Sequence, residues 1–149
     1  MYKGEMPLFR ALRKRLDALR AWLDAPPCVA VVLDSESQRS LLAWWSQGLG
    51  KPFLEDVKAH HMTVWYNPPE DREFPIGLRV SLKVVGWAAD ELGQAVVVRS
   101  PEVLSHNLNP HVTVSVSPGT GAVYSNKLLT RGWAVADGPR LHGVVKVIR

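Results

Sequence analysis

The residues best suited to chemistry in this chain of 149 residues form a His-x-Thr pattern that occurs twice, at His61 and Thr63 and again at His111 and Thr113. Each copy lies in an alternating apolar run that predicts a β-strand. Side chains two residues apart on a strand share a face, so each histidine lies beside its own threonine. The composition predicts only about 0.1 such patterns by chance. Two copies on matched strands therefore indicate one shared site.

Two imidazoles and two hydroxyls on neighbouring strands suit the hydrolysis of a phosphodiester. That reaction needs a base to activate the nucleophile and an acid to protonate the leaving oxygen, and histidine titrates near ~6.5, so one ring can be neutral while the other is protonated. Thr63 and Thr113 would donate hydrogen bonds to non-bridging phosphate oxygens. The residues leave open which histidine is the base. Neither motif has a third ligand at a spacing suited to catalytic zinc, so we expect no metal ion and no cofactor.

Three residues near the motifs are predicted to contact the substrate. Trp65 falls on the His61 face by the period of two, where its ring could stack on a nucleobase. Ser115 falls on the face of Thr113, where its hydroxyl could reach the rim of a phosphate site. Tyr124 follows in a glycine-bearing loop, and loops at strand ends carry much of a site's specificity. His60 falls on the face opposite His61 and is predicted to be structural.

Bulk properties describe one domain over residues 1–149, with an N-terminal amphipathic helix in residues 1–24 and a core in residues 25–149. A net charge of +4 favours an anionic partner. A single cysteine, Cys28, excludes an internal disulfide. No apolar stretch approaches the ~18 residues of a membrane span, and no secretory signal is recognisable. We therefore expect a cytoplasmic monomer that does not enter a membrane.

The elements expected along the chain mix helices and strands without regular alternation, which predicts an α+β fold. Leucines recur at three- and four-residue steps from Pro7 to Asp24, as in an amphipathic helix. A second helix begins after Asp34 and ends near Gly48. The strands are expected at 28–33, 58–66, 78–88, 94–99, 111–117 and 141–148, with a short helix or loop at 101–108 and a short helix at 125–129. The two motifs, each followed by a proline-bearing loop, suggest two similar lobes with a cleft between them.

These paired strands resemble the two-histidine (2H) phosphoesterase superfamily, which includes the LigT-like RNA phosphodiesterases and the cyclic phosphodiesterase domains of fungal tRNA ligases. The resemblance spans Val29 to Arg149. Tyr124, Ser125 and Asn126 are similar to a segment with a Ser-Asn pair in the tRNA-ligase branch. The resemblance implies a bilobal fold, with two antiparallel sheets flanking a central cleft and helices outside. It also implies that the histidines act as acid and base while the threonines hold the phosphate.

The expected activity is metal-independent hydrolysis of cyclic phosphodiesters of the 2′,3′-cyclic phosphate type, on nucleotides or RNA ends. A nucleotide or RNA bearing a cyclic phosphate is thus the expected partner. Two alternatives remain open. The chain could degrade cyclic nucleotide or oligonucleotide signals, or it could be an RNA- or nucleotide-binding module without turnover.

Overall fold

The computed structural model describes residues 6–149, apart from the side chains of residues 21–24. Over these residues the chain forms an α+β fold with three α-helices, a short π-helical segment and eight strands. The helical elements are α1 (Pro7–Asp24), α2 (Ser35–Ala43), η1 (Trp44–Gly48) and α3 (Tyr124–Thr130). The strands are β1 (Cys28–Leu33), β2 (Asp56–Val57), β3 (His61–Tyr66), β4 (Arg79–Ala89), β5 (Gly93–Arg99), β6 (His111–Val116), β7 (Ala134–Val135) and β8 (Arg140–Ile148).

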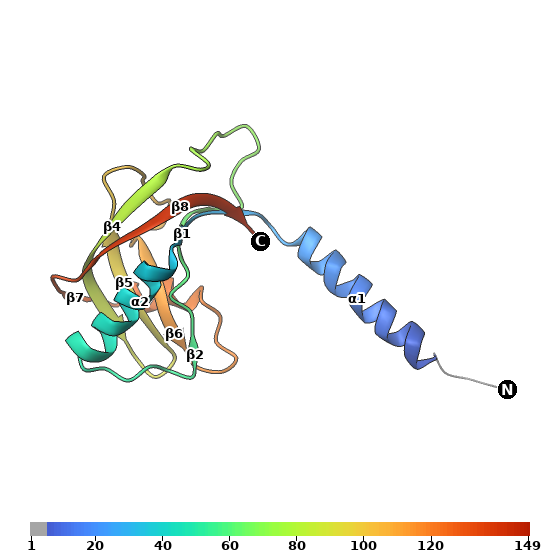
Figure 1. Ribbon diagram of the computed structural model, residues 1–149, viewed down its shortest axis with the longest axis horizontal. Helices are drawn as coiled ribbons and strands as arrows, with labels where there is room; N and C mark the ends of the chain where they lie inside the picture. The colour runs from blue at the N-terminus through green and yellow to red at the C-terminus, as the bar shows by residue number, and fades with distance from the viewer. Residues whose placement is uncertain (1–5) are drawn as a thin grey trace.

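Six of the strands close into an antiparallel barrel (Figure 1). They follow the order β6-β3-β1-β8-β4-β5, and pairing of β5 with β6 completes the circle. The short strands β2 and β7 pair with β6 and β4. Two separate flanking sheets were expected, whereas the described strands belong to one sheet. The reason is that β1 pairs with β8, which joins the strands into one continuous sheet, and that β5 pairs with β6, which closes the two edges of that sheet into a barrel.

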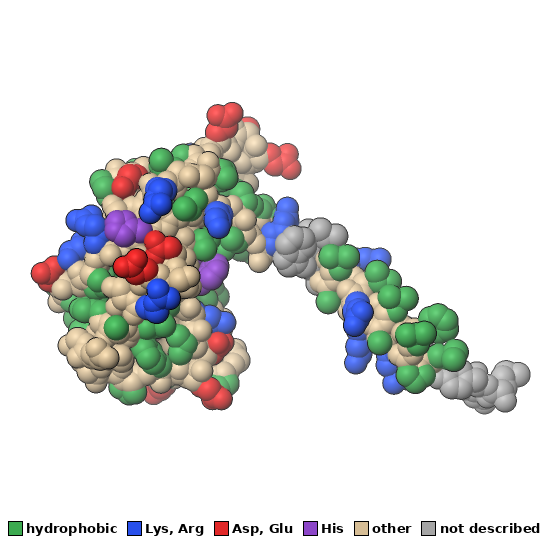
Figure 2. Space-filling model, viewed as in Figure 1, with side chains coloured by type: hydrophobic (Ala, Val, Ile, Leu, Met, Phe, Trp, Pro, Cys, Tyr) green, Lys and Arg blue, Asp and Glu red, His purple; other side chains and the backbone are tan. Residues whose placement is uncertain are grey.

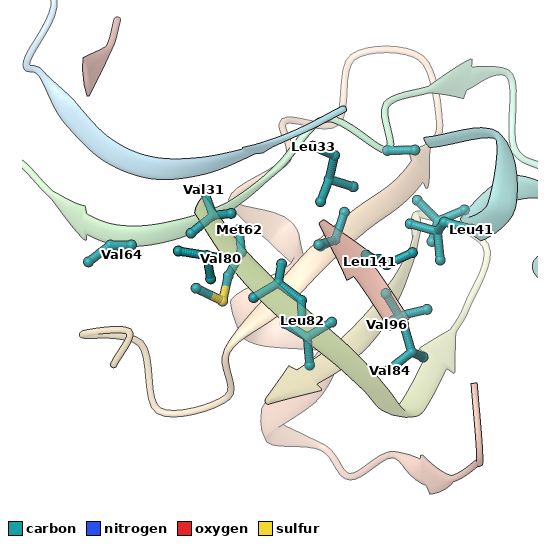
Figure 3. Close-up of a cluster of buried hydrophobic side chains, with 14 of the residues drawn as sticks. Val31, Leu33, Leu41, Met62, Val64, Val80, Leu82, Val84, Val96 and Leu141 are labelled. Atoms are coloured by element: carbon teal, nitrogen blue, oxygen red, sulfur yellow. The ribbon is translucent and has the colours of Figure 1, made fainter. Parts of the chain in front are cut away.

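The main core fills the barrel, because every barrel strand contributes buried apolar side chains to one cluster. Figure 3 shows part of this cluster, with Val31, Met62, Leu82, Val96 and Leu141 among its labelled members. A second cluster joins the outer face of β4 and β5 to α3. Since inward and outward residues alternate along a strand, residues next to core positions in sequence face out of the barrel.

Most of the predicted elements are confirmed. The Asp34 carboxylate caps α2 by accepting a hydrogen bond of 2.7 Å from the Ser37 N–H. β3 begins at His61, later than predicted, because Ala59 has a positive φ of 48° that interrupts an extended strand. Residues 101–110 form a loop, and the two-residue strands β2 and β7 had no sequence signal.

The helix α1 extends away from the barrel, joined to β1 by residues 25–27 (Figure 1). Each described side chain from Met6 to Arg20 is exposed. Over the described residues, no helix is both long and apolar enough to cross a membrane.

Candidate functional site

The two motif strands are direct neighbours in the barrel. β3 and β6 pair antiparallel, with Met62 opposite Val112, and both of these side chains are buried in the core. This register sets His61 across from Thr113 and Thr63 across from His111, all on the outward face. The four side chains thus occupy the corners of a square, with the two histidines on one diagonal and the two threonines on the other.

All four motif side chains line one cavity of about 480 Å³. The volume falls within the ordinary range for small-molecule sites, roughly 300–1,000 Å³. The remaining lining residues come from the start and end of the barrel chain, the end of β3, the loop before β6, the segment before α3 and α3 itself: Pro26, Cys28, Tyr66, Asn107, Ala122, Val123, Asn126, Ile148 and Arg149. The expected convergence of the two motifs on one site is therefore seen in the structure.

His111 is held by the backbone just before its own strand. Its Nδ1 lies 2.8 Å from the carbonyl oxygen of Asn109. Because a carbonyl can only accept, Nδ1 carries the proton, and Nε2 is the nitrogen left for a substrate. Burial lowers the pKa of His111, and the Asn109 carbonyl partly offsets this by favouring the protonated ring.

Thr113 is fixed from α3. Its hydroxyl lies 2.8 Å from the Ser125 hydroxyl and donates to the Ala122 carbonyl at 3.3 Å. Ser125 is fully buried, so this pair locks the first turn of α3 against β6. The same turn brings Asn126 to the cavity. The Ser-Asn pair noted in the sequence thus supports one threonine and lines the site.

His61 is paired with its neighbour in sequence. The Nδ1 atoms of His60 and His61 lie 2.9 Å apart, with the rings nearly perpendicular. Burial lowers the pKa of His61 to about 4, with further contributions from His60 and His111. The ring is therefore neutral at neutral pH in the free protein. His60 was predicted to be structural, on the face opposite His61, but its ring contacts the His61 ring. His60 precedes β3, so the alternation of faces along the strand does not apply to it.

Thr63 has a different set of contacts from Thr113. The Cys28 thiol lies 3.8 Å from its hydroxyl, a weak hydrogen bond, and burial raises the pKa of that thiol. The loop before β6 attaches to the backbone here, since the Ser105 hydroxyl donates to the Thr63 carbonyl at 2.7 Å. That loop continues to Asn107, which lines the cavity, and to Asn109, which holds His111.

Trp65 does not share the His61 face, and this prediction is wrong. In the β1–β3 register Thr63 faces Ala30 while Trp65 faces Val29, so Val64 is an extra residue in a β-bulge. The bulge reverses the alternation, and Tyr66 lines the cavity in place of Trp65. Trp65 instead stacks on His106, with ring centroids 3.8 Å apart, and lies under the Arg72 guanidinium.

Ser115 is displaced by an equivalent bulge in the second motif. Thr113 faces Ala95 and Ser115 faces Gln94, which leaves Val114 as the extra residue. Ser115 therefore lies on the face opposite Thr113, fully buried. Its hydroxyl donates to the Gln94 side chain at 2.6 Å and accepts from the Leu54 N–H at 3.0 Å. The predicted placement of Ser115 at the phosphate rim is thus corrected to a structural position.

Tyr124 also points away from the cavity. Its ring lies against Gly93, where a side chain would collide with it, and its hydroxyl donates to the Asp90 carboxylate. Arg131 donates to the same hydroxyl at 3.2 Å. Tyr124 thus ties α3 to the β4–β5 turn. Tyr124 therefore does not line the cavity, where it was predicted to contact the substrate.

Residues 6–149 hold no group of three or more histidine, cysteine or acidic side chains that could bind a metal ion. No protein-family model matches the chain, and no curated protein sequence matches it. The site offers two imidazoles with lowered pKa values and two threonine hydroxyls. That set can transfer protons and bind an anion.

Proposed function

We propose that the protein is a metal-independent phosphodiesterase that hydrolyses cyclic phosphodiesters of nucleotides or RNA ends, of the 2′,3′-cyclic phosphate type. The observation that carries the proposal is the register of β3 and β6, which gathers both histidines and both threonines around one cavity. This arrangement is also what the resemblance to 2H phosphoesterases implies.

The diagonal arrangement suits an in-line displacement at phosphorus. In such a reaction the attacking water and the leaving oxygen lie on opposite sides of the phosphorus atom. Histidines at opposite corners of the square can serve one side each. Water loses a proton to one ring as its oxygen bonds to phosphorus, and the other ring protonates the departing ribose oxygen as the P–O bond breaks. The product is a phosphomonoester.

We assign the acid role to His111 and the base role to His61. The Asn109 carbonyl accepts from Nδ1 of His111 and so stabilises the protonated ring, which favours a donor of protons through Nε2. The pKa of His61, about 4, keeps that ring neutral and able to accept a proton. This requires that His61 donates its Nδ1 hydrogen to His60, leaving Nε2 bare.

The threonines would bind the two non-bridging oxygens from the other diagonal. Negative charge grows on these oxygens as the fifth bond to phosphorus forms, so hydroxyl donors aimed at them stabilise the transition state more than the substrate. The Thr113 hydroxyl can turn from the Ala122 carbonyl toward a substrate while it still accepts from Ser125.

The proposal divides four of the barrel strands into two related halves, β1 with β3 and β5 with β6. Each half holds one motif and one bulge directly after the threonine. The halves meet where β3 pairs with β6, and the cavity lies at this seam. Under this proposal the cavity would take the place of the central cleft that the resemblance to 2H phosphoesterases implies.

The test is hydrolysis of 2′,3′-cyclic nucleotides and of RNA with a cyclic phosphate end, measured in EDTA. We expect His61→Ala and His111→Ala each to lower kcat by about 10²- to 10⁴-fold, the usual contribution of a general acid or base. His142→Ala is the matched control, because His142 is exposed and lies outside the cavity. It should hydrolyse at the wild-type rate.

The outcome also separates the alternatives. Turnover of cyclic dinucleotides or other cyclic oligonucleotides, but not of these substrates, would move the activity to signal degradation. Tight binding of cyclic-phosphate RNA without turnover of any of them would support a binding module. Wild-type rates in both alanine variants would refute the paired-histidine mechanism.

A further inference from the structure

The helix α1 carries an apolar face that no other described part of the chain covers. Its large apolar side chains are between 51% and 75% exposed: Leu8, Phe9, Leu12, Leu16 and Leu19. Most of the stability of a helix in a protein comes from packing of its apolar face, and the apolar face of this 18-residue helix has no such packing within the described residues. The exposed apolar face of α1 therefore indicates that the helix packs against a partner outside the barrel.

The apolar side chains lie on one narrow face. At about 100° per residue, these five residues fall within an arc of about 100° around the helix. Arg13 and Arg20 border the arc on one side and Arg15 borders it on the other. Figure 2 shows hydrophobic side chains gathered along one flank of α1 and Lys and Arg side chains along another. Cations thus frame the apolar face along both edges.

The charge of α1 selects among possible partners. From Pro7 to Arg20 the helix has five cationic side chains and one carboxylate, Asp17. In a two-stranded coil with a second copy, the bordering arginines would face like charges beside the seam, which opposes pairing. A nucleic acid backbone would satisfy the cations but leave the leucines in water. A surface with an apolar interior and an anionic boundary satisfies both.

We propose that α1 lies in the interface of an anionic lipid bilayer. The apolar arc would enter the boundary between headgroups and acyl chains, while the bordering arginines extend to lipid phosphates on either side. The helix is about 27 Å long, and its separation from the barrel leaves the whole face open to a flat surface (Figure 1).

This contact is not membrane spanning. It nevertheless departs from the expectation that the protein does not enter a membrane, which depended on the absence of a long apolar stretch and did not consider a helix lying in the interface. The contact is also independent of the proposed phosphodiesterase activity, because α1 contributes no residue to the cavity. Residues 25–27 join α1 to β1, and Pro26 of this connection lines the cavity. Membrane binding would therefore hold the site close to the lipid surface.

The test is co-sedimentation of the full chain with vesicles, one set of phosphatidylcholine alone and one of phosphatidylcholine and phosphatidylglycerol in equal parts. A double variant, Leu12→Gln with Leu16→Gln, removes the middle of the apolar arc. The matched control, Ala11→Gln with Ala18→Gln, places the same side chains outside the apolar arc, on the polar side of the helix. A third variant, Arg13→Gln with Arg15→Gln and Arg20→Gln, removes the bordering charges.

We expect the wild type and the control with glutamine at positions 11 and 18 to sediment with the anionic vesicles. The leucine variant, with glutamine at positions 12 and 16, should remain in solution. The arginine variant should lose most of its preference for anionic over neutral vesicles, and added salt should weaken wild-type binding. All variants should keep the wild-type melting temperature and phosphodiesterase rate.

Three results would overturn the proposal. The wild type could fail to sediment with anionic vesicles, or the leucine variant could sediment as well as the wild type. Light scattering could also show a wild-type dimer that the leucine variant abolishes, in the absence of vesicle binding. That last result would assign the apolar face to a second copy of the chain.

Discussion

The two His-x-Thr motifs have the same sequence pattern but unequal surroundings. In β6, His111 is held by a backbone carbonyl and Thr113 by a buried serine of α3, and both residues are buried. In β3, His61 is held by an exposed neighbouring histidine and Thr63 by a weak thiol contact. One half of the site is therefore fixed before a substrate arrives, whereas the other half can adjust.

The largest expected effect is a loss of kcat when either threonine is replaced. It tests whether the two threonines contribute equally to catalysis although their contacts differ. Thr63→Ala and Thr113→Ala should each lower kcat by about 10²-fold, as for the loss of one donor to a developing oxyanion. Only Thr113→Ala should also lower the melting temperature, because it leaves the buried Ser125 hydroxyl without its threonine partner. Steady-state kinetics and thermal unfolding measure the two effects. A wild-type kcat for Thr63→Ala would show that only the second motif binds the phosphate.

A second prediction concerns Ser115, the residue that follows the bulge in β6. Ser115→Ala should destabilise the fold by about 1–3 kcal/mol, because the buried Gln94 side chain and the partly buried Leu54 N–H both lose their partner. Its kcat should stay at the wild-type value, since the side chain faces away from the cavity. Chemical denaturation and kinetics on the same sample test this. A large loss of kcat with normal stability would place Ser115 back at the substrate.

The pH dependence of kcat/KM follows from the two lowered pKa values. The rate should rise as pH increases through about 4, where the base His61 loses its proton. It should fall again as pH increases through the pKa of the acid His111, which lies below its usual 6.5. The optimum is therefore expected on the acidic side of 6.5 in the free enzyme, with about a tenfold loss per pH unit above the second pKa. A profile centred above pH 7 would contradict this assignment.

The smallest expected effect concerns His60, which holds His61 in the adjustable half. His60→Ala removes a neighbour that lowers the pKa of His61, so this pKa should rise and the acidic limb of kcat/KM should move to higher pH. The pKa should stay below its ordinary value of 6.5, because burial is the larger cause of its lowering. NMR titration of the His61 ring measures the pKa directly, and an unchanged value would remove His60 from the site.

Local patterns in the sequence were sufficient for the regular elements and for the motif residues. Leucine spacing located α1 and the Asp34 cap located α2, because both depend on interactions within a few residues. The paired motif located both histidines and both threonines of the cavity. The helices could be predicted because their stabilising interactions are between residues close in sequence. The motif residues could be predicted because the same pattern occurs twice.

The errors at Trp65 and Ser115 share one physical cause. Strict alternation put Trp65 and Ser115 on the motif faces, but a bulge after each threonine adds one residue and reverses the faces beyond it. A bulge depends on the partner strand, and the valines at both bulges look like ordinary strand residues. Barrel closure through β5 and β6 and the approach of Asn107 and Asn126 to the cavity likewise depend on contacts between distant segments.

Cys28 gives the protein a built-in reporter. It is the only cysteine in the sequence, it lines the cavity and its sulfur lies beside the Thr63 hydroxyl. A thiol-reactive fluorophore or mass tag would therefore attach at one defined point, next to the proposed phosphate position. Its raised pKa makes the thiol slow to react near neutral pH, so labelling calls for mildly alkaline buffer. Protection from labelling would then reveal which compounds occupy the cavity, including compounds that the protein never turns over.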